Sequence, residues 1–256
     1  MITGQALSHL RRLAMVVGCI LGLSSSIAAA DPLSDAIDHP NRPAADRQRD
    51  PTSLPAQVLK FSGLPESGVV VDLFGGGGYY SEIIARTMTD SGRVYLHNNA
   101  AYVNFTGDAL TERLQRNRLP NVVRYDREIN EFDLPEDSVD LVIAVLSYHD
   151  IYYKTEGWDL DPETFFTTIH EILKPGGTLL IIDHVALAGS GKSAAQELHR
   201  IDPAFARQDI ESHGFEFAGE LQVLKSADDP LNVSVFDDSI RRQTSRFVYK
   251  FVEPTD

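Results

Sequence analysis

The chain has 256 residues, 43% of them hydrophobic, which is enough for one α/β domain with a substantial core behind a short leader. Its 37 acidic residues outnumber its 23 basic ones, and the formal net charge is −14 at pH 7. An acidic surface argues against nucleic acid and anionic membranes as general partners. A small-molecule substrate remains compatible with this charge, and no pattern in the sequence indicates an oligomeric state.

The first thirty residues have the pattern of a targeting segment. Arg11 and Arg12 precede an apolar stretch at 13–23 that is too short to span a bilayer comfortably, and three alanines at 28–30 resemble a cleavage site. We therefore expect residues 1–30 to be a signal peptide that is cleaved before Asp31. The mature protein, residues 31–256, is then periplasmic or secreted and has no stable membrane insertion.

Two alternatives to cleavage remain open. In the first, the leader is an uncleaved N-terminal anchor. In the second, a lipid is attached at Cys19, because VVGC at 16–19 resembles a bacterial lipoprotein box. Cys19 is the only cysteine of the chain, so a cleaved protein has none. That composition suits an oxidising compartment, and it excludes thiolate metal sites and cysteine nucleophiles.

After a polar lead-in at 31–55, partly helical around 44–49, apolar strand patterns alternate with helical patterns. Strands are expected at 69–71, 93–97, 121–125, 138–146 and 178–183, and helices at 54–61, 79–88, 108–118, 162–173 and 203–213. Two further strand patterns, 215–224 and 245–252, flank a polar loop. The alternation predicts a parallel sheet with helices on both faces, and the final pair predicts an antiparallel edge hairpin.

The stretch VVVDLFGGGGYY at 69–80 combines a buried strand, a glycine turn and the start of a helix. This is the first half of a nucleotide-binding βαβ unit, in which glycines let the backbone approach a ligand and the helix N-terminus offers free N–H groups. A tight strand-to-helix turn also needs glycine for purely structural reasons. The turn alone therefore leaves both interpretations open.

The order of the motifs resembles that of the class I S-adenosylmethionine-dependent methyltransferases. The resemblance runs from residue 54 to the end and rests on VVVDLFGGGGYY, GRVYLHN, NVVRYDREI, LPEDSVDLVIAVLSYHD and ILKPGGTLLIIDH, of which the ILKPGG turn is especially typical. It implies a Rossmann-like α/β fold with a seven-stranded, mostly parallel sheet and an antiparallel C-terminal edge hairpin. It also implies S-adenosylmethionine as the cofactor. The segments GRVYLHNNA, LSYHD, IIDH, LHRID and RFVYKF further resemble a group of exported, predicted methyltransferases.

The resemblance assigns roles to the glycine turn. Asp72, Gly75, Gly76 and Gly78 match the motif that cradles the methionine part of the cofactor. Phe74 stands where the family has a glycine, and this departure narrows the expected pocket.

Three further positions are implied as cofactor contacts. Asn98 occupies the end of the second strand, where most members place an acid on the ribose hydroxyls; an amide binds a diol without a charge-assisted hydrogen bond. Asp126 follows the third strand, where the family contacts the adenine amino group. Ser147 lies at the end of the fourth strand, under the cofactor.

Ligands of open α/β sheets bind beyond the carboxyl ends of the strands, where Ser147–Asp150 and Asp183–His184 are expected to converge. Methyl transfer needs alignment of the acceptor first, and then a base if the acceptor carries a proton. We expect His149 to be that base, with Asp150 as its orienting partner. The structural alternative is that both residues cap the loop after the strand.

The remaining histidines of this region, His184 and His199, are expected to be hydrogen-bonded structural residues. A metal site built from His149, Asp183 and His184 matches no spacing motif, so no metal is expected.

Three functional hypotheses follow. The first is an S-adenosylmethionine-dependent methyltransferase acting on an unidentified small molecule. The second is a non-catalytic exported binding protein with a methyltransferase-like fold, which Phe74 and the absence of an acid at Asn98 favour. The third is a dinucleotide oxidoreductase, against which the antiparallel final strands and the ILKPGG turn argue.

Overall fold

The computed structural model describes residues 31–255, so the leader and its cleavage site lie outside the described residues. The lead-in forms three short helices, α1 (Pro32–Ile37), α2 (Ala44–Arg47) and α3 (Asp50–Ser53). The sequence predicts only the second of these, because α1 and α3 are too short to show a clear apolar period. The described part of the chain contains no helix with the length and apolar character that crossing a membrane requires.

A seven-stranded sheet forms the centre of the protein, in the order β3-β2-β1-β4-β7-β9-β8. Its strands are β1 (Val69–Leu73), β2 (Arg93–Asn98), β3 (Val122–Asp126), β4 (Val139–Val145), β7 (Leu173–His184), β8 (Glu216–Glu220) and β9 (Arg246–Val252). The pairs from β3 to β7 are parallel, whereas β9 is antiparallel to both of its neighbours. The expected Rossmann-like sheet with its antiparallel C-terminal edge hairpin is confirmed.

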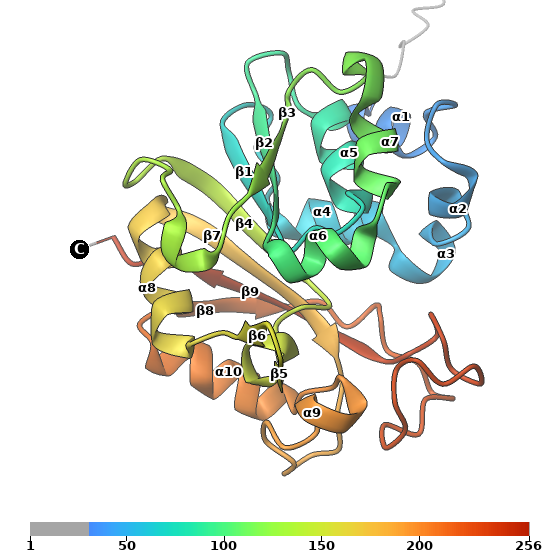
Figure 1. Ribbon diagram of the computed structural model, residues 1–256, viewed down its shortest axis with the longest axis vertical. Helices are drawn as coiled ribbons and strands as arrows, with labels where there is room; N and C mark the ends of the chain where they lie inside the picture. The colour runs from blue at the N-terminus through green and yellow to red at the C-terminus, as the bar shows by residue number, and fades with distance from the viewer. Residues whose placement is uncertain (1–30, 256) are drawn as a thin grey trace, which may run out of the picture. The chain divides into compact units, whose positions relative to one another are not determined.

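Helices cover both faces of this sheet, as Figure 1 shows. The apolar side chains of β1 alternate between the two cores. Val70 belongs to the core that includes side chains of α4 and α5, and Val71 belongs to the core that includes side chains of α8 and α10. The helices are α4 (Pro55–Ser62), α5 (Tyr79–Thr87), α6 (Ala100–Thr106), α7 (Ala109–Leu114), α8 (Pro162–Ile172), α9 (Ala195–Leu198) and α10 (Pro203–Ser212). Strands buried on both faces explain why the central strand patterns are continuous apolar runs.

Several boundaries differ from the sequence-based expectation. The ILKPGG turn is part of β7: Leu173 already pairs with Val139, and the register slips before Thr178. The helix expected at 108–118 ends early and continues as the 3-10 turn η1 (Gln115–Asn117), and α6 was not expected. A small hairpin of β5 (Lys154–Thr155) and β6 (Trp158–Asp159) follows the 3-10 turn η3 (His149–Tyr152). Another 3-10 turn, η2 (Ile129–Glu131), follows β3.

One buried carboxylate joins α5 to the segment that follows α6. Glu82 is fully buried, and its oxygens lie 2.9 Å from Arg86, 2.5 Å from Arg113 and 2.6 Å from Arg118. Burial raises the pKa of Glu82, but hydrogen bonds from Arg118 and Arg86 and the charge of Arg113 lower it by more, and the net shift is downward. The carboxylate therefore stabilises the fold in its ionised form.

We predict that Glu82→Gln lowers the free energy of unfolding by roughly 3–5 kcal/mol at pH 7, because three arginines lose a buried counter-charge. Urea denaturation measures this difference. A suitable control is Glu211→Gln, which removes an exposed helical ion pair with Arg207 and costs less than about 0.5 kcal/mol.

The same pair of proteins gives a pH test. Because the folded pKa of Glu82 lies below its usual 4.5, its contribution is complete above pH 4.5 and is lost as the pH falls through the folded pKa. The stability difference between wild type and Glu82→Gln therefore narrows in acid. A difference that grows on acidification contradicts this assignment.

Candidate functional site

The glycine turn between β1 and α5 is shaped by Asp72. Its buried carboxylate accepts hydrogen bonds from the Ser81 backbone N–H at 3.0 Å and the Ser81 hydroxyl at 2.5 Å. Burial raises the pKa of Asp72 to about 6 against the opposing effect of these bonds. Asp72 therefore ties the end of β1 to the first turn of α5.

The four glycines divide into two pairs. A side chain at Gly75 would lie 2.7 Å from the Asp72 carboxylate, and one at Gly78 would lie 2.6 Å from Leu96, so packing requires glycine at both. The nearest atoms to a side chain at Gly76 and Gly77 are 3.8 and 3.6 Å away. The second pair is not needed for packing, and it leaves the backbone open on this side of the turn.

The end of β2 holds the glycine turn through Asn98. The Gly76 N–H donates to Asn98 Oδ1 at 2.9 Å, and Asn98 Nδ2 donates to the Gly76 carbonyl at 3.1 Å. The adjacent His97 adds two bonds: its ring accepts from the Phe74 N–H, and its carbonyl accepts from the Gly75 N–H. Both polar groups of Asn98 are thus engaged by the turn, whereas the sequence-based expectation directs them at a ribose.

A cavity of about 290 Å³ lies over the glycine turn. Gly75 and Gly77 form part of its wall, and Arg49 contributes a cation, whose guanidinium lies 4.4 Å from the centre of the Tyr79 ring. The other lining residues are Ala45, Asp46, Asp72, Phe74, Tyr79, Tyr80, Ala109, Arg113, Val145, Leu146 and Arg242. The lining therefore combines three arginines and two carboxylates with apolar and aromatic side chains.

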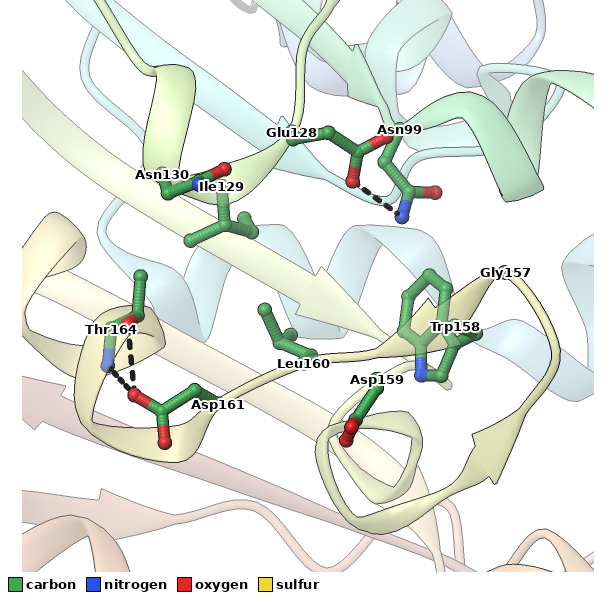
Figure 2. Close-up of a pocket in the computed structure, with 10 residues that line it drawn as sticks. All are labelled: Asn99, Glu128, Ile129, Asn130, Gly157, Trp158, Asp159, Leu160, Asp161 and Thr164. Atoms are coloured by element: carbon green, nitrogen blue, oxygen red, sulfur yellow. Dashed lines mark hydrogen bonds between the residues drawn. The ribbon is translucent and has the colours of Figure 1, made fainter.

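A second cavity, of about 200 Å³, lies beyond the ends of β2 and β3 (Figure 2). Asn99 and Glu128 stand on one side of it, joined by a hydrogen bond of 3.3 Å, and Trp158 and Leu160 of the following hairpin segment stand opposite. Asn99 also caps α6 by accepting from the Tyr102 N–H.

Aromatic rings separate the two cavities. Phe74, whose φ of 52° is in the left-handed region, is buried and lines the first cavity, while Trp158 lines the second. The Phe74 ring lies 5.3 Å from Trp158 and 5.0 Å from Tyr102. The side chain that replaces the expected glycine thus forms the partition between the cavities.

Two expected cofactor residues carry buried polar atoms without a hydrogen-bond partner among residues 31–255. They are Asp126 Oδ1, at the end of β3, and Ser147 Oγ, after β4. The other oxygen of Asp126 pairs with Arg124 Nε at 2.6 Å. An unpaired buried polar atom costs free energy, so these two atoms fit a ligand that supplies hydrogen bonds at the strand ends.

A cluster of histidines and carboxylates lies at the ends of β4 and β7. His149 Nδ1 donates to Asp183 Oδ1 at 2.8 Å, and the His149 backbone N–H donates to Asp183 Oδ2 at 2.6 Å. On the opposite side of the ring, His149 Nε2 lies 3.2 Å from Asp150 Oδ1 and 3.3 Å from His199 Nδ1. Asp183 therefore orients the imidazole, and Asp150 faces its other nitrogen.

Two carboxylates beside one ring alter its proton affinity. Burial lowers the pKa of His149, but Asp183 and Asp150 raise it by more, to about 10. The pKa of Asp150 is in turn held well below its usual range, mainly by His149, against the effect of burial. The two carboxylates thus favour the protonated form of His149, which opposes the role of base expected from the sequence.

The two remaining histidines have different environments. His184 is buried beside Thr244, with 2.7 Å between Nδ1 and the hydroxyl, and burial together with nearby cations holds its pKa well below 6.5. This is the expected structural role. His199 ends α9 in a left-handed conformation with φ of 52°, and its ring faces His149 instead.

Comparison with known proteins places this geometry in context. Residues 71–181 match the family model described as a methyltransferase domain. No protein with a curated description matches the sequence. The match spans the glycine turn, Asn98, Asp126 and the cluster residues His149 and Asp150.

Solved structures share the fold at low sequence identity. A SAM-dependent methyltransferase from Aquifex aeolicus is 20% identical, with a TM-score of 0.57 over 81% of this chain and 95% of its own. Phosphoethanolamine N-methyltransferase 2 from Haemonchus contortus, solved with S-adenosyl-L-methionine, is 15% identical, with a TM-score of 0.56 over 88% of this chain and 61% of its own. The [4+2]-cyclase SpnF is 14% identical, with a TM-score of 0.54 over 80% and 81%.

The structural likeness establishes the Rossmann-like methyltransferase fold, and SpnF shows that a protein described as a cyclase also has it. The domain match over residues 71–181 supports an enzyme of the methyltransferase type.

We predict that Asn98→Asp destabilises the protein, because a carboxylate replaces the amide donor and faces the Gly76 carbonyl in a buried site. Loss of this bond lowers the free energy of unfolding by roughly 1–3 kcal/mol, measured by urea denaturation. Asn121→Asp, which removes the donor to the Ala85 carbonyl at a partly buried position, is the control with a smaller effect. An Asn98→Asp variant as stable as wild type contradicts the pair of hydrogen bonds between Asn98 and Gly76.

Proposed function

We propose that this protein is an S-adenosylmethionine-dependent methyltransferase acting on a small molecule, which binds beyond the ends of β4 and β7. The observation that carries the proposal is the pair of unpaired buried polar atoms, Asp126 Oδ1 and Ser147 Oγ, at the ends of β3 and β4. Their chain neighbours Glu128 and Leu146 each line one of the two cavities. The domain match over residues 71–181 supports the same reaction class.

The residues present fit the cofactor at several points. Gly76 and Gly77 leave the backbone open, Arg49 offers a positive charge for a carboxylate, and Asp126 and Ser147 offer free hydrogen-bonding atoms. Bound S-adenosylmethionine would supply a sulfonium methyl group for in-line displacement. A ligand that occupies both cavities at once requires the rings of Phe74 and Trp158 to move apart.

On the acceptor side, His149 and Asp150 are the proposed catalytic pair, held in place by Asp183 and Tyr102. Asp183 fixes the His149 ring, and the Tyr102 hydroxyl donates to Asp150 Oδ2 at 2.6 Å. A fixed ring and a fixed carboxylate align an acceptor atom, and His149 can receive its proton once the imidazole has lost its own.

A second candidate function is a non-catalytic exported binding protein with the same fold. The partition formed by Phe74, Tyr102 and Trp158 favours it, because these rings fill space between the cavities that a whole cofactor needs.

Binding of the cofactor tests the first proposal. We expect calorimetry of the purified protein to show heat with S-adenosylmethionine and with S-adenosylhomocysteine. Gly77→Leu abolishes this heat, because its side chain projects from the cavity wall, whereas Gly77→Ala, whose Cβ makes an ordinary 3.6 Å contact with Ala109, binds nearly as wild type does.

No heat with either ligand at millimolar concentration contradicts the methyltransferase proposal and favours the non-catalytic alternative. Equal cofactor binding by Gly77→Leu and wild type would show that the cofactor does not bind at the glycine turn. Circular dichroism of both variants checks that they fold.

We also propose that residues 1–30 are a cleaved signal peptide and that the mature protein is periplasmic or secreted. Support comes from Asp31, which is the N-cap of α1 through a hydrogen bond from the Leu33 N–H and forms an ion pair with Lys60. Asp31, the first residue after the expected cleavage site, thus makes contacts within the folded domain.

N-terminal sequencing of exported protein tests this: we expect the first residue to be Asp31. A chain that begins at Cys19 and carries a lipid contradicts the prediction, as does a chain that retains residues 1–30.

A further inference from the structure

We propose that His149, Asp150 and His199 form a binding site for one divalent transition-metal ion. The proposal rests on the positions of three ligand atoms and does not depend on methyl transfer. The atoms are His149 Nε2, Asp150 Oδ1 and His199 Nδ1, and they belong to the one such group of three within residues 31–255.

The spacing of the three atoms matches a metal coordination shell. The distances are 3.2 Å from His149 Nε2 to Asp150 Oδ1, 3.3 Å from His149 Nε2 to His199 Nδ1, and 3.7 Å from His199 Nδ1 to Asp150 Oδ1. Bonds of 2.0–2.1 Å in a tetrahedral zinc site separate neighbouring ligand atoms by about 3.3 Å. An ion at the centre of this triangle therefore requires only small shifts of the side chains.

The atoms behind the ligands are arranged as in metal sites. Asp183 accepts from His149 Nδ1, which leaves Nε2 free to ligate, and Tyr102 donates to the Asp150 oxygen that faces away from the triangle. A carboxylate that accepts from a ligating histidine fixes the ring and raises its basicity, and a hydroxyl that donates to a ligating carboxylate fixes the orientation of that carboxylate. Two of the three ligands are thus oriented by a hydrogen bond on their far side.

The third ligand is positioned by its backbone and by neighbouring rings. His199 has a left-handed backbone at the end of α9, a costly conformation for a residue other than glycine, and its ring lies 4.8 Å from Tyr153 and 4.9 Å from Phe236. This conformation turns the imidazole toward His149.

Charge also favours a cation in this triangle. Asp150 and Asp183 place two carboxylates against one His149 ring, and two ring nitrogens face each other at 3.3 Å. A divalent ion gives both nitrogens a common partner and balances the two carboxylates. The side chains of Asp150 and His199 remain 14% and 21% exposed, which leaves an approach to an open coordination position.

The donor set selects the class of metal. Two imidazoles and one carboxylate suit zinc, iron(II), cobalt or nickel, whereas calcium and magnesium prefer oxygen ligands alone. The set of metal ligands considered from the sequence includes His184, whose ring contacts Thr244 instead. It lacks His199, which lies fifty residues beyond His149 in the chain. If the proposed function holds, an oxygen or nitrogen atom of the acceptor can occupy the open position. The ion would lower the pKa of that acceptor atom.

The test is a Zn²⁺ titration by calorimetry, without cofactor, on protein stripped with a chelator and dialysed. We expect one ion per chain, confirmed by elemental analysis. We expect His199→Gln and Asp150→Asn each to weaken binding at least tenfold, and Tyr102→Phe to weaken it several-fold while keeping the ring that packs on Phe74. Titration with Co²⁺ should give visible bands of a low-coordinate site that His199→Gln removes.

The matched control is His213→Gln. His213 lies 3.4 Å from Glu163 and 3.9 Å from Asp209, so it has carboxylate neighbours but belongs to no group of three within the described residues. It should bind Zn²⁺ as wild type does. Three variants with separate structural effects keep the test valid if one of them fails to fold.

Absence of stoichiometric Zn²⁺ and Co²⁺ binding by the stripped wild type overturns the proposal, as does unchanged binding by folded His199→Gln and Asp150→Asn. Zn²⁺ binding without any S-adenosylmethionine binding would uphold the metal site and contradict the proposed function. Binding of S-adenosylmethionine without binding of Zn²⁺ would agree with the proposed function and contradict the metal site.

Discussion

The paired hydrogen bonds between Asp183 and His149 are the interaction on which the acceptor side of the site depends. Parallel pairing of β4 with β7 places Val145 beside Ile182, so each strand delivers its next residues to the same edge. The 3-10 turn η3 then brings His149 back over Asp183, which holds both its backbone N–H and its ring. Asp150 and His199 face the other side of that ring. Without Asp183, no carboxylate fixes which nitrogen of His149 points at them.

The glycine turn and the histidine cluster are connected through Tyr102. Its ring packs 5.0 Å from Phe74, which lines the cavity over the glycines, and its hydroxyl donates to Asp150. Trp158 also contacts both parts: its ring packs on Phe74, and its Nε1 donates to the Asp150 carbonyl at 2.7 Å. A ligand that displaces the Phe74 ring therefore acts directly on the residues that hold Asp150. This gives a physical route by which cofactor binding and acceptor binding influence each other.

The sequence predicted the fold well and the site only in part. Apolar runs such as that of β4 and the glycine turn identify a parallel sheet because burial on both faces constrains every residue. Contacts between residues that are distant in the sequence leave no such pattern of apolar residues. The amide of Asn98 binds Gly76 because β2 lies beside β1, and His199 contacts His149 although fifty residues separate them in the chain. Likewise, the glycines of the ILKPGG segment predict a turn, whereas no sequence pattern indicates that the segment pairs with β4.

The central proposal is that S-adenosylmethionine binds over the glycine turn, and we infer that it extends from there into the second cavity at the strand ends. A crystal structure of the protein with S-adenosylhomocysteine tests it most directly. We predict electron density over Gly76 and Gly77 that continues to the Asn99–Glu128 cavity. We also predict hydrogen bonds to Asp126 Oδ1 and Ser147 Oγ, with the rings of Phe74 and Trp158 moved apart. Ligand bound elsewhere, or bound with those two atoms still unpaired and the rings in contact, would contradict it.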